Sequence, residues 1–262
     1  MTFINSFGII IKNSMNIILF NENEISQRLS LKDPRGEHIK KVLHKSSGET
    51  FEAGVINVSE GVCRILEISD KDISFIYESK RKVSPCYKIK LIVGFPRPIQ
   101  LRRLLRDVVS LGVAEIHLTG TELGEKSYLK SNLLEKGATN AAMIDGASQA
   151  KSATLPELFM HKTLNECLDF LFADKYSKEE CELVLLDNVK PDLRLSDAVQ
   201  LRAFENKTVI AAVGSERGWT DKERNAFEQR GFKFYSLGNR ILRTETASIA
   251  AVSLILAAMK KL

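Results

Sequence analysis

Short runs of hydrophobic residues alternate with polar turns between residues 15 and 85. The segments TFEAGVINV, GVCRILEIS and DISFIYES are rich in β-branched and aromatic residues, and the polar turns SEG and SDKD separate them. Several short strands with tight turns predict a small β-barrel or sheet. One turn of helical periodicity interrupts this pattern, because Ile39, Val42 and Leu43 fall on one helical face.

Longer apolar runs begin after residue 85 and continue to residue 262. YKIKLIVGF is a continuous apolar strand of the kind found in parallel sheets. An amphipathic helix that ends at Gly112 is predicted next, from apolar residues three or four positions apart: Leu101, Leu104, Leu105, Val108 and Leu111. VAEIHLT, ELVLLD, TVIAAVG and FKFYSLG are further predicted strands with helices between them. This alternation predicts an α/β domain with a largely parallel sheet.

Ligands of a parallel sheet bind at the carboxyl ends of its strands. Chemistry is therefore expected in the loops after Phe95, Thr119, Asp187, Gly214 and Gly238.

The loop that opens at Gly214 combines glycines with a predicted helix start. Gly214 and Gly218 bracket a turn, and Thr220 and Glu223 have the spacing of a capping box. Glycines let a backbone approach a ligand closely, and a helix start offers free amide donors. The same pattern also describes a tight turn that binds nothing, so both interpretations stand on these residues alone.

The loop after Gly238 reads NRILR and leads into the most apolar helix of the chain. Thr244 is a suitable N-cap, and Glu245 suits the positive end of the helix dipole. In one interpretation Glu245 only caps the helix and pairs with Arg243. In the other, the two glycine-bearing turns form one pocket and Arg243 projects into it.

A basic segment surrounds the helix predicted before Gly112. Six basic residues and one acidic residue lie between Lys88 and Gly112. Four arginines at or before the helix face away from its leucines: Arg97, Arg102, Arg103 and Arg106. Such a face is either simply solvated or a phosphate-binding surface. The net charge of +5 is compatible with a nucleic-acid partner.

Composition is that of an ordinary globular protein, with 44% hydrophobic residues. The cysteines (Cys63, Cys86, Cys167, Cys181) form no C-x-x-C pair, and the histidines (His38, His44, His117, His161) do not cluster in sequence. This spacing predicts free thiols and no metal site. The longest apolar run, 247–259, is shorter than the roughly 20 residues of a membrane span. The N-terminal stretch lacks the features of a signal peptide, so we expect a cytoplasmic protein that does not enter a membrane.

Two C-terminal motifs resemble those of the RsmE family, ribosomal RNA uridine-N3 methyltransferases of the SPOUT superfamily. LGNRILRTETA is similar to the family's LG-x-(R/I)-(I/V)-LR-(T/A)-ETA, and VGSERGWTDKE to its IGPEGG-(F/L)-(S/T)-x-x-E. The chain departs from the second pattern at Ser215 and Arg217, where the family has proline and glycine.

The resemblance extends upstream through GEHIKKVLH, RDVVSLGVAEIHLTGTELGEKS and AAMIDGASQAKSATLPEL. His44 replaces the family's arginine, Asp107 its lysine and Ser110 its glutamate. The glutamate and arginine of the third of these motifs are also replaced. The match covers nearly the whole chain from Met15, so residues 1–14 are expected to be an extension without a role.

The resemblance implies a fold, a cofactor and partners. Residues 15–85 would form a PUA-like β-barrel that binds RNA, and residues 86–262 a SPOUT α/β methyltransferase domain with a deep trefoil knot. The protein would be a homodimer that methylates uridine N3 in 16S ribosomal RNA of the small subunit. S-adenosylmethionine would be wrapped by two stretches of backbone: Val213, Gly214, Ser215, Glu216 and Gly218, then Leu237, Gly238, Ile241 and Leu242.

The resemblance also suggests roles for charged residues. Arg243 would stabilise the uracil anion left when the N3 proton departs, and Glu245 would orient Arg243 rather than act as the base. RNA phosphates would be met by Arg97, Arg102, Arg103, Arg106 and Lys126. Two alternatives remain open: a SPOUT methyltransferase for another RNA site, and a non-catalytic RNA-binding or ribosome assembly protein.

Overall fold

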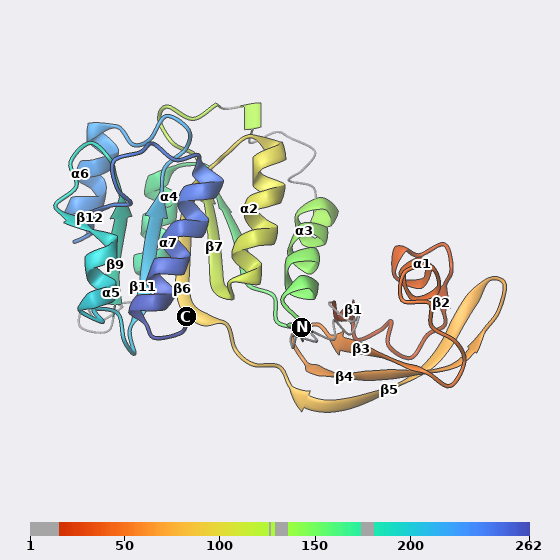
Figure 1. Ribbon diagram of the computed structural model, residues 1–262. Helices are drawn as coiled ribbons and strands as arrows, with labels where there is room; N and C mark the ends of the chain where they lie inside the picture. The colour runs from red at the N-terminus through yellow and green to blue at the C-terminus, as the bar shows by residue number, and fades with distance from the viewer. Residues whose placement is uncertain (1–15, 126, 129–135, 174–180) are drawn as a thin grey trace, which may run out of the picture. The chain divides into compact units, whose positions relative to one another are not determined.

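The computed structural model describes residues 16–125, 127–128, 136–173 and 181–262. The expected extension over residues 1–14, the start at Met15 and the predicted RNA contact Lys126 all lie outside the described residues. The chain divides into two compact units, here called unit 1 (Met1–Val83 with Lys151–Ala153) and unit 2 (Ser84–Ala150 with Thr154–Leu262). Figure 1 draws unit 1 mainly in red and orange, and unit 2 from yellow to blue.

Unit 1 is built on a five-stranded sheet with the order β1-β3-β4-β5-β2. Its elements are β1 (Ile18–Phe20), β2 (Leu29–Ser30), α1 (Pro34–Lys41), β3 (Thr50–Val55), β4 (Ser59–Ile68) and β5 (Asp72–Lys82). The three strands predicted from short apolar runs are confirmed as β3, β4 and β5, which pair antiparallel. The helix is also confirmed, but only Ile39 of its predicted apolar face is buried, and Val42 is 60% exposed at its C-cap.

Unit 2 contains a seven-stranded sheet in the order β10-β12-β9-β11-β6-β7-β8, and each pair of neighbouring strands is parallel. Its strands are β6 (Tyr87–Gly94), β7 (Val113–Thr119), β8 (Glu157–His161), β9 (Cys181–Leu186), β10 (Leu193–Arg194), β11 (Thr208–Val213) and β12 (Lys233–Ser236). Its helices are α2 (Pro98–Ser110), α3 (Lys136–Gln149), α4 (Leu164–Ala173), α5 (Leu195–Gln200), α6 (Asp221–Gln229) and α7 (Thr244–Ala258). The predicted α/β architecture is confirmed.

The helices α4, α6 and α7 help to bury the sheet of unit 2 because they present apolar side chains to it. On one face, α4 and α6 cover Ile92, Leu185 and Ile210 through residues such as Leu168 and Phe227. Elsewhere α2 packs between α3 and α7, and α7 packs against α5 and the strands β6 and β11 (Figure 1). A parallel sheet buried in this way explains why its strands read as continuous apolar runs.

Local signals correctly located two helix ends of unit 2. The helix α2 ends just before Gly112, and Thr220 and Glu223 form the predicted capping box at the start of α6. The edge strand β8, by contrast, has no prediction of its own. Among the described strands it pairs only with β7, and Met160 within it is 51% exposed, so its sequence lacks the apolar run that marks a central strand.

The prediction that Thr244 caps α7 is wrong. Arg243 occupies the N-cap position without a side-chain cap, and Thr244 is the first helical residue. The Thr244 hydroxyl instead donates to the carbonyl oxygen of Gly214 at 3.2 Å. The hydroxyl that local spacing assigned to the helix start thus donates its hydrogen bond to a carbonyl group 30 residues away.

Candidate functional site

The loops after β9, β11 and β12 meet at one edge of the sheet of unit 2. These strands are parallel neighbours, so their carboxyl ends lie side by side. A cavity of about 250 Å³ opens there. Its lining comes from the β9 loop (Asp187, Asn188, Val189), the β11 loop and α6 (Val213, Gly214, Ser215, Glu216, Arg217, Gly218, Arg224), and the β12 loop and α7 (Leu237, Gly238, Arg240, Ile241, Leu242, Thr244, Ala247).

All nine residues expected to wrap the cofactor line this one cavity. The structure therefore brings together two loops that the sequence separates by about two dozen residues. Sequence reasoning pointed to the loop after Asp187 but named none of its residues as part of the site. The missing signal is strand order, because β9 lies between β11 and β12 in the sheet.

The β11 loop is a tight turn held to its surroundings by hydrogen bonds. The amide of Gly218 donates to the carbonyl of Ser215 at 2.9 Å. A Cβ atom on Gly214 would lie 3.0 Å from the Cα of Gly218, so this close approach requires glycine. The hydroxyl of Ser215 accepts a hydrogen bond from Thr121 at 3.1 Å. Proline at this position would lack that hydroxyl, so the departure from the family pattern has a structural role here.

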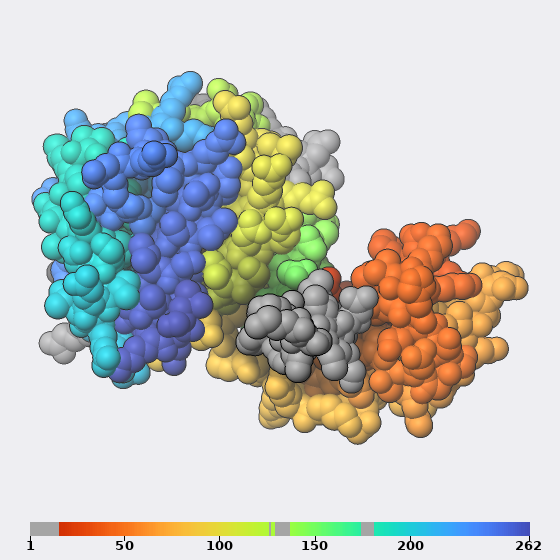
Figure 2. Space-filling model, viewed as in Figure 1, coloured from red at the N-terminus to blue at the C-terminus, as the bar shows by residue number. Residues whose placement is uncertain are grey.

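A charged side chain joins the β11 loop to the basic helix. The carboxylate of Glu216 accepts the backbone N–H of Arg97, the N-cap residue of α2, at 3.0 Å. The first residue of the predicted RNA surface thus lies beside a residue of the cavity lining. In Figure 2, α2 (yellow) and α7 (blue) lie side by side on the visible face of unit 2.

Arg224 and Asp187 form a buried ion pair in the cavity wall. Arg224 Nε lies 2.5 Å from Asp187 Oδ2, and their side chains are only 10% and 2% exposed. The hydrogen bond to Asp187 raises the pKa of the Arg224 guanidinium. Asp187 also accepts the amide of Val189 at 3.0 Å. This pair holds the β9 loop against α6, so it acts on the shape of the wall.

Arg243 and Glu245 do not form the pair that one interpretation of the sequence predicted. Among the described residues neither forms an ion pair, and neither side chain contributes to the cavity lining. Arg243 is exposed, whereas Glu245 is buried, with its Oε2 atom lacking a hydrogen-bond partner among the described residues. The helix start separates them because Arg243 is the N-cap and Glu245 already lies in the first turn.

The predicted basic face is exposed, as its position opposite the leucines requires. Arg97, Arg102, Arg103 and Arg106 all lie at the surface, while Leu101, Leu104 and Leu105 are buried. Only Arg106 among the four forms an ion pair within the described residues, with its neighbour Asp107 at 2.8 Å. Asp107 stands where the family has lysine, so it lowers the positive charge of this face.

A second, larger cavity of about 1110 Å³ lies at the carboxyl ends of β6, β7 and β8 and against α6. Its lining mixes charged and apolar residues: Phe95, Gly120, Thr121, Glu122, Gly124, Glu125, Lys162, Thr163, Leu164, Asn165, Lys222, Glu223, Asn225, Ala226 and Gln229. Thr121 connects this lining to the β11 loop through Ser215. None of the described residues predicted for the site lines this cavity.

Three histidines and cysteines that lie apart in the sequence meet in the fold. Atoms of His117, His161 and Cys167 that can bind a metal lie within 4.8 Å of one another. Their spacing in sequence hides this because they come from β7, β8 and α4. The described cysteines form no disulfide. No helix in the described part of the chain combines the length and apolar character needed to cross a membrane.

Residues 82–256 match the model of an RNA methyltransferase domain family. Because this match covers well over half of the chain, the protein belongs to that family. Within it, the chain is 39% identical to ribosomal RNA small subunit methyltransferase E of Treponema pallidum, over 93% of this chain and 91% of that protein. It is 32% identical to ribosomal RNA small subunit methyltransferase E 1 of Borreliella burgdorferi, over 90% and 95%.

These identities place the chain in the ribosomal RNA small subunit methyltransferase E family, as the two C-terminal motifs predicted. A solved structure supports the fold. Ribosomal RNA small subunit methyltransferase E from Neisseria gonorrhoeae, bound to S-adenosyl methionine, aligns with a TM-score of 0.70 over 92% of this chain and 97% of that one. At 22% identity this likeness concerns the fold alone.

Proposed function

We propose that the protein transfers a methyl group from S-adenosylmethionine to N3 of a uridine in 16S ribosomal RNA. One observation carries this proposal: the two family motifs, far apart in sequence, line a single cavity at the carboxyl edge of the sheet. Membership of the methyltransferase E family supports the substrate class. The solved relative from Neisseria gonorrhoeae supports the cofactor.

The residues of the cavity suit a nucleoside-containing cofactor. Gly218 and Gly238 have φ angles of +70° and +114°, and an added Cβ at either would meet no atom within 4 Å. Both therefore leave room that a side chain would fill. Val189 and Ile241 are 61% and 85% exposed, so they offer apolar surface for a ring to cover. The volume of the cavity is slightly below the roughly 300 Å³ at which drug-sized pockets begin, so part of the cofactor would lie outside it.

S-adenosylmethionine supplies an activated methyl group when bound, and the protein must hold donor and acceptor in line. The backbone of the β11 and β12 loops would fix the cofactor. The exposed guanidinium of Arg243 would stabilise the uracil anion formed when the N3 proton leaves. Glu245 would orient Arg243 once RNA is bound, because a buried carboxylate oxygen without a partner costs roughly 1–3 kcal/mol.

The finer features of the fold and the RNA contacts belong to the same proposal. Unit 1 would be a PUA-like barrel that binds RNA, and the C-terminal part of unit 2 would be tied in a deep trefoil knot. Two copies of the chain would form a homodimer. The exposed arginines of α2 (Arg97, Arg102, Arg103, Arg106), together with Lys126, would contact RNA phosphates.

Primer extension on 16S ribosomal RNA tests this function, because a methyl group on N3 blocks base pairing and stops the polymerase. RNA from cells with the gene should show one stop that is absent from a deletion strain and returns on complementation. A stop that depends on the gene but lies in another RNA would favour the alternative SPOUT methyltransferase.

Titration of the purified protein with S-adenosylmethionine tests the remaining alternative. Saturable binding is expected for either methyltransferase. If no binding is detected and no stop depends on the gene, the protein is a non-catalytic RNA-binding or assembly protein and the proposed function is wrong.

A further inference from the structure

The imidazole of His117 is held in one orientation inside unit 2. Its side chain is fully buried, and its ring stacks on Phe159 with centroids 4.7 Å apart. His117 Nε2 lies 3.0 Å from Glu115 Oε2, and the other oxygen of Glu115 lies 2.7 Å from Lys90 Nζ. A carboxylate paired with lysine is ionised and only accepts, so we assign the His117 proton to Nε2. Nδ1 therefore carries the lone pair, which accepts a hydrogen bond from His161 Nε2 at 3.1 Å.

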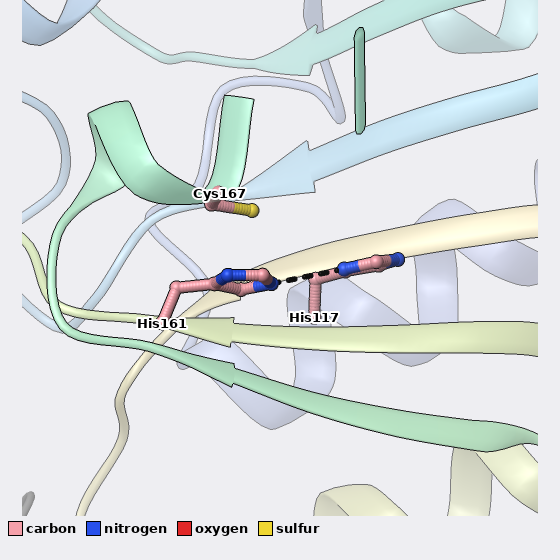
Figure 3. Close-up of side chains that lie close together, drawn as sticks. All are labelled: His117, His161 and Cys167. Atoms are coloured by element: carbon pink, nitrogen blue, oxygen red, sulfur yellow. Dashed lines mark hydrogen bonds between the residues drawn. The ribbon is translucent and has the colours of Figure 1, made fainter. Parts of the chain in front are cut away.

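Two further donors from different elements lie near His117 Nδ1. His117 Nδ1 lies 3.1 Å from His161 Nε2, and Figure 3 shows the Cys167 sulfur above the same two rings. The parallel register places His161 beside Thr119, two residues along from His117, so both histidines face the same side of the sheet. The helix α4 covers this side and brings Cys167 with it. All three donor atoms lie within 4.8 Å.

We propose that this cluster binds one zinc ion through His117 Nδ1, His161 Nε2 and Cys167 Sγ. Imidazole and thiolate are the ligands that zinc prefers in proteins, and a carboxylate behind a metal-bound histidine, here Glu115, is its usual support. On binding, the thiol proton of Cys167 leaves to solvent and the ring proton of His161 moves from Nε2 to Nδ1, so that bonds from both nitrogens and the sulfur to the metal replace the hydrogen bond between the histidines. Water would complete the tetrahedron. His161 is half-buried and Phe170 is 51% exposed, so this side offers an entry path.

A stack of neutral rings without a metal is the alternative explanation of the same contacts. Stacking accounts for the ring orientations, because Phe159 packs on His117 and Phe170 packs on both histidines. It does not require a thiol beside two ring nitrogens, nor an ionised Glu115–Lys90 pair behind one of them.

The position of the ion indicates what it would do. Lys162, Thr163, Leu164 and Asn165, which lie in sequence between His161 and Cys167, form part of the lining of the larger cavity. An ion held by both ends of this segment would fix the turn from β8 into α4. The zinc site would thus be structural, and it is independent of the methyl transfer proposed above.

Cobalt(II) titration of the chelator-treated full-length protein tests the site, because tetrahedral cobalt has intense visible bands and a thiolate ligand adds a near-ultraviolet band. One equivalent of cobalt is expected to produce the visible bands and the near-ultraviolet band, and added zinc should remove all of them. Cys167→Ser should abolish the thiolate band, whereas Cys86→Ser, a control outside the cluster, should keep it. Glu115→Gln should weaken binding by about 10- to 100-fold.

His161→Asn provides a second variant at a half-buried position, in case the serine at position 167 disturbs the core. It should lose the tetrahedral bands while circular dichroism shows a folded protein. The proposal is overturned if the wild-type protein gives no thiolate band. It is also overturned if that band persists unchanged in folded Cys167→Ser.

Discussion

The cavity at the carboxyl edge of unit 2 has two walls, and each presents arginine in a different state. In the wall of β9 and α6, Arg224 is 10% exposed and bound to Asp187, with Asp221 3.1 Å from its Nη1 atom. In the wall of the β12 loop, Arg240 is exposed, and so is Arg243, which follows this wall without lining the cavity; neither forms an ion pair within the described residues. Arg224 holds the protein together, whereas Arg240 and Arg243 are available to a ligand.

This difference shows why a residue type alone does not assign a role. A buried guanidinium must be paired, because an isolated buried charge is very unfavourable. An exposed one keeps its water and is free to exchange that water for a phosphate or a developing anion. Variants of the paired and the exposed arginines test that contrast.

Replacing the free arginine should remove the reaction and spare the cofactor. Arg243→Ala should lower the rate of methyl transfer by about 10²- to 10³-fold, because the charge on the uracil anion loses its stabilising cation. Binding of S-adenosylmethionine, measured by calorimetry, should change little, since Arg243 does not line the cavity. The control Arg217→Gly, which restores the residue of the family pattern, should keep activity. Retained activity in Arg243→Ala would refute its role.

Breaking the paired arginine should instead act on stability. Arg224→Met leaves the Asp187 carboxylate buried without its partner, which should reduce the free energy of unfolding by about 3 kcal/mol. Urea unfolding followed by the fluorescence of Trp219, the single tryptophan of the chain, measures this in unit 2. The double variant Arg224→Met, Asp187→Leu should recover most of the loss. Equal stabilities for wild type and Arg224→Met would show that the pair does not hold the wall.

The exposed arginines of α2 extend the contrast to RNA. In Arg102→Gln, Arg103→Gln the dependence of RNA affinity on salt should become shallower, by about one unit of logarithmic slope for each phosphate that the variant no longer neutralises. Filter binding at several salt concentrations gives this slope. Lys260→Gln, which removes a lysine paired with Glu205, serves as the control. An unchanged slope in the double variant would mean that this face is only solvated.

Unit 1 contains its own paired arginine, and here the expected effect is smallest. Hydrogen bonds from Arg35 lower the pKa of both Glu24 and Asp33. These pKa values are lower in the folded than in the unfolded state. The two carboxylates therefore stabilise unit 1 at pH values above the ordinary pKa range of carboxyl groups. That stability is lost as the pH falls through the lowered values. Arg35→Met should therefore weaken the pH dependence of the stability of unit 1 below about pH 4.

Hydrogen exchange of amides in β3, β4 and β5, measured between pH 3 and pH 6, reports this effect in unit 1. Tryptophan fluorescence reports unit 2 and should be the same in both proteins, because Trp219 belongs to that unit. If the protection of these amides against exchange decreases equally in wild type and in Arg35→Met as the pH falls, the carboxylates do not stabilise unit 1 through Arg35.

Sequence reasoning succeeded where a feature depends on neighbours along the chain. The central strands β6, β9 and β11 follow from continuous apolar runs, and the capping box of α6 follows from Thr220 and Glu223. The two loops predicted to bind the cofactor came from a family motif rather than from spacing, and residues of both line one cavity. The parallel order of the strands explains that meeting.

It failed where a contact joins distant segments. Arg243 and Glu245 are two residues apart, yet the start of α7 leaves one exposed and the other buried. The hydroxyl of Thr244 binds Gly214 instead of its own helix. No local pattern contains this information, because the competing partner is set by the packing of β11 against its neighbours.

The amino-acid sequence by itself determined the α/β character of unit 2, its central strands and the motifs that identify the family. These features follow from hydrophobic periodicity and from residue types at fixed spacing. Only the tertiary structure decided which arginine is paired and which is free. It also decided that His117 and His161 of the sheet meet Cys167 of α4. The physical reason is that burial and strand order bring together groups that are dozens of residues apart, and these neighbours determine what a charged or metal-binding side chain can do.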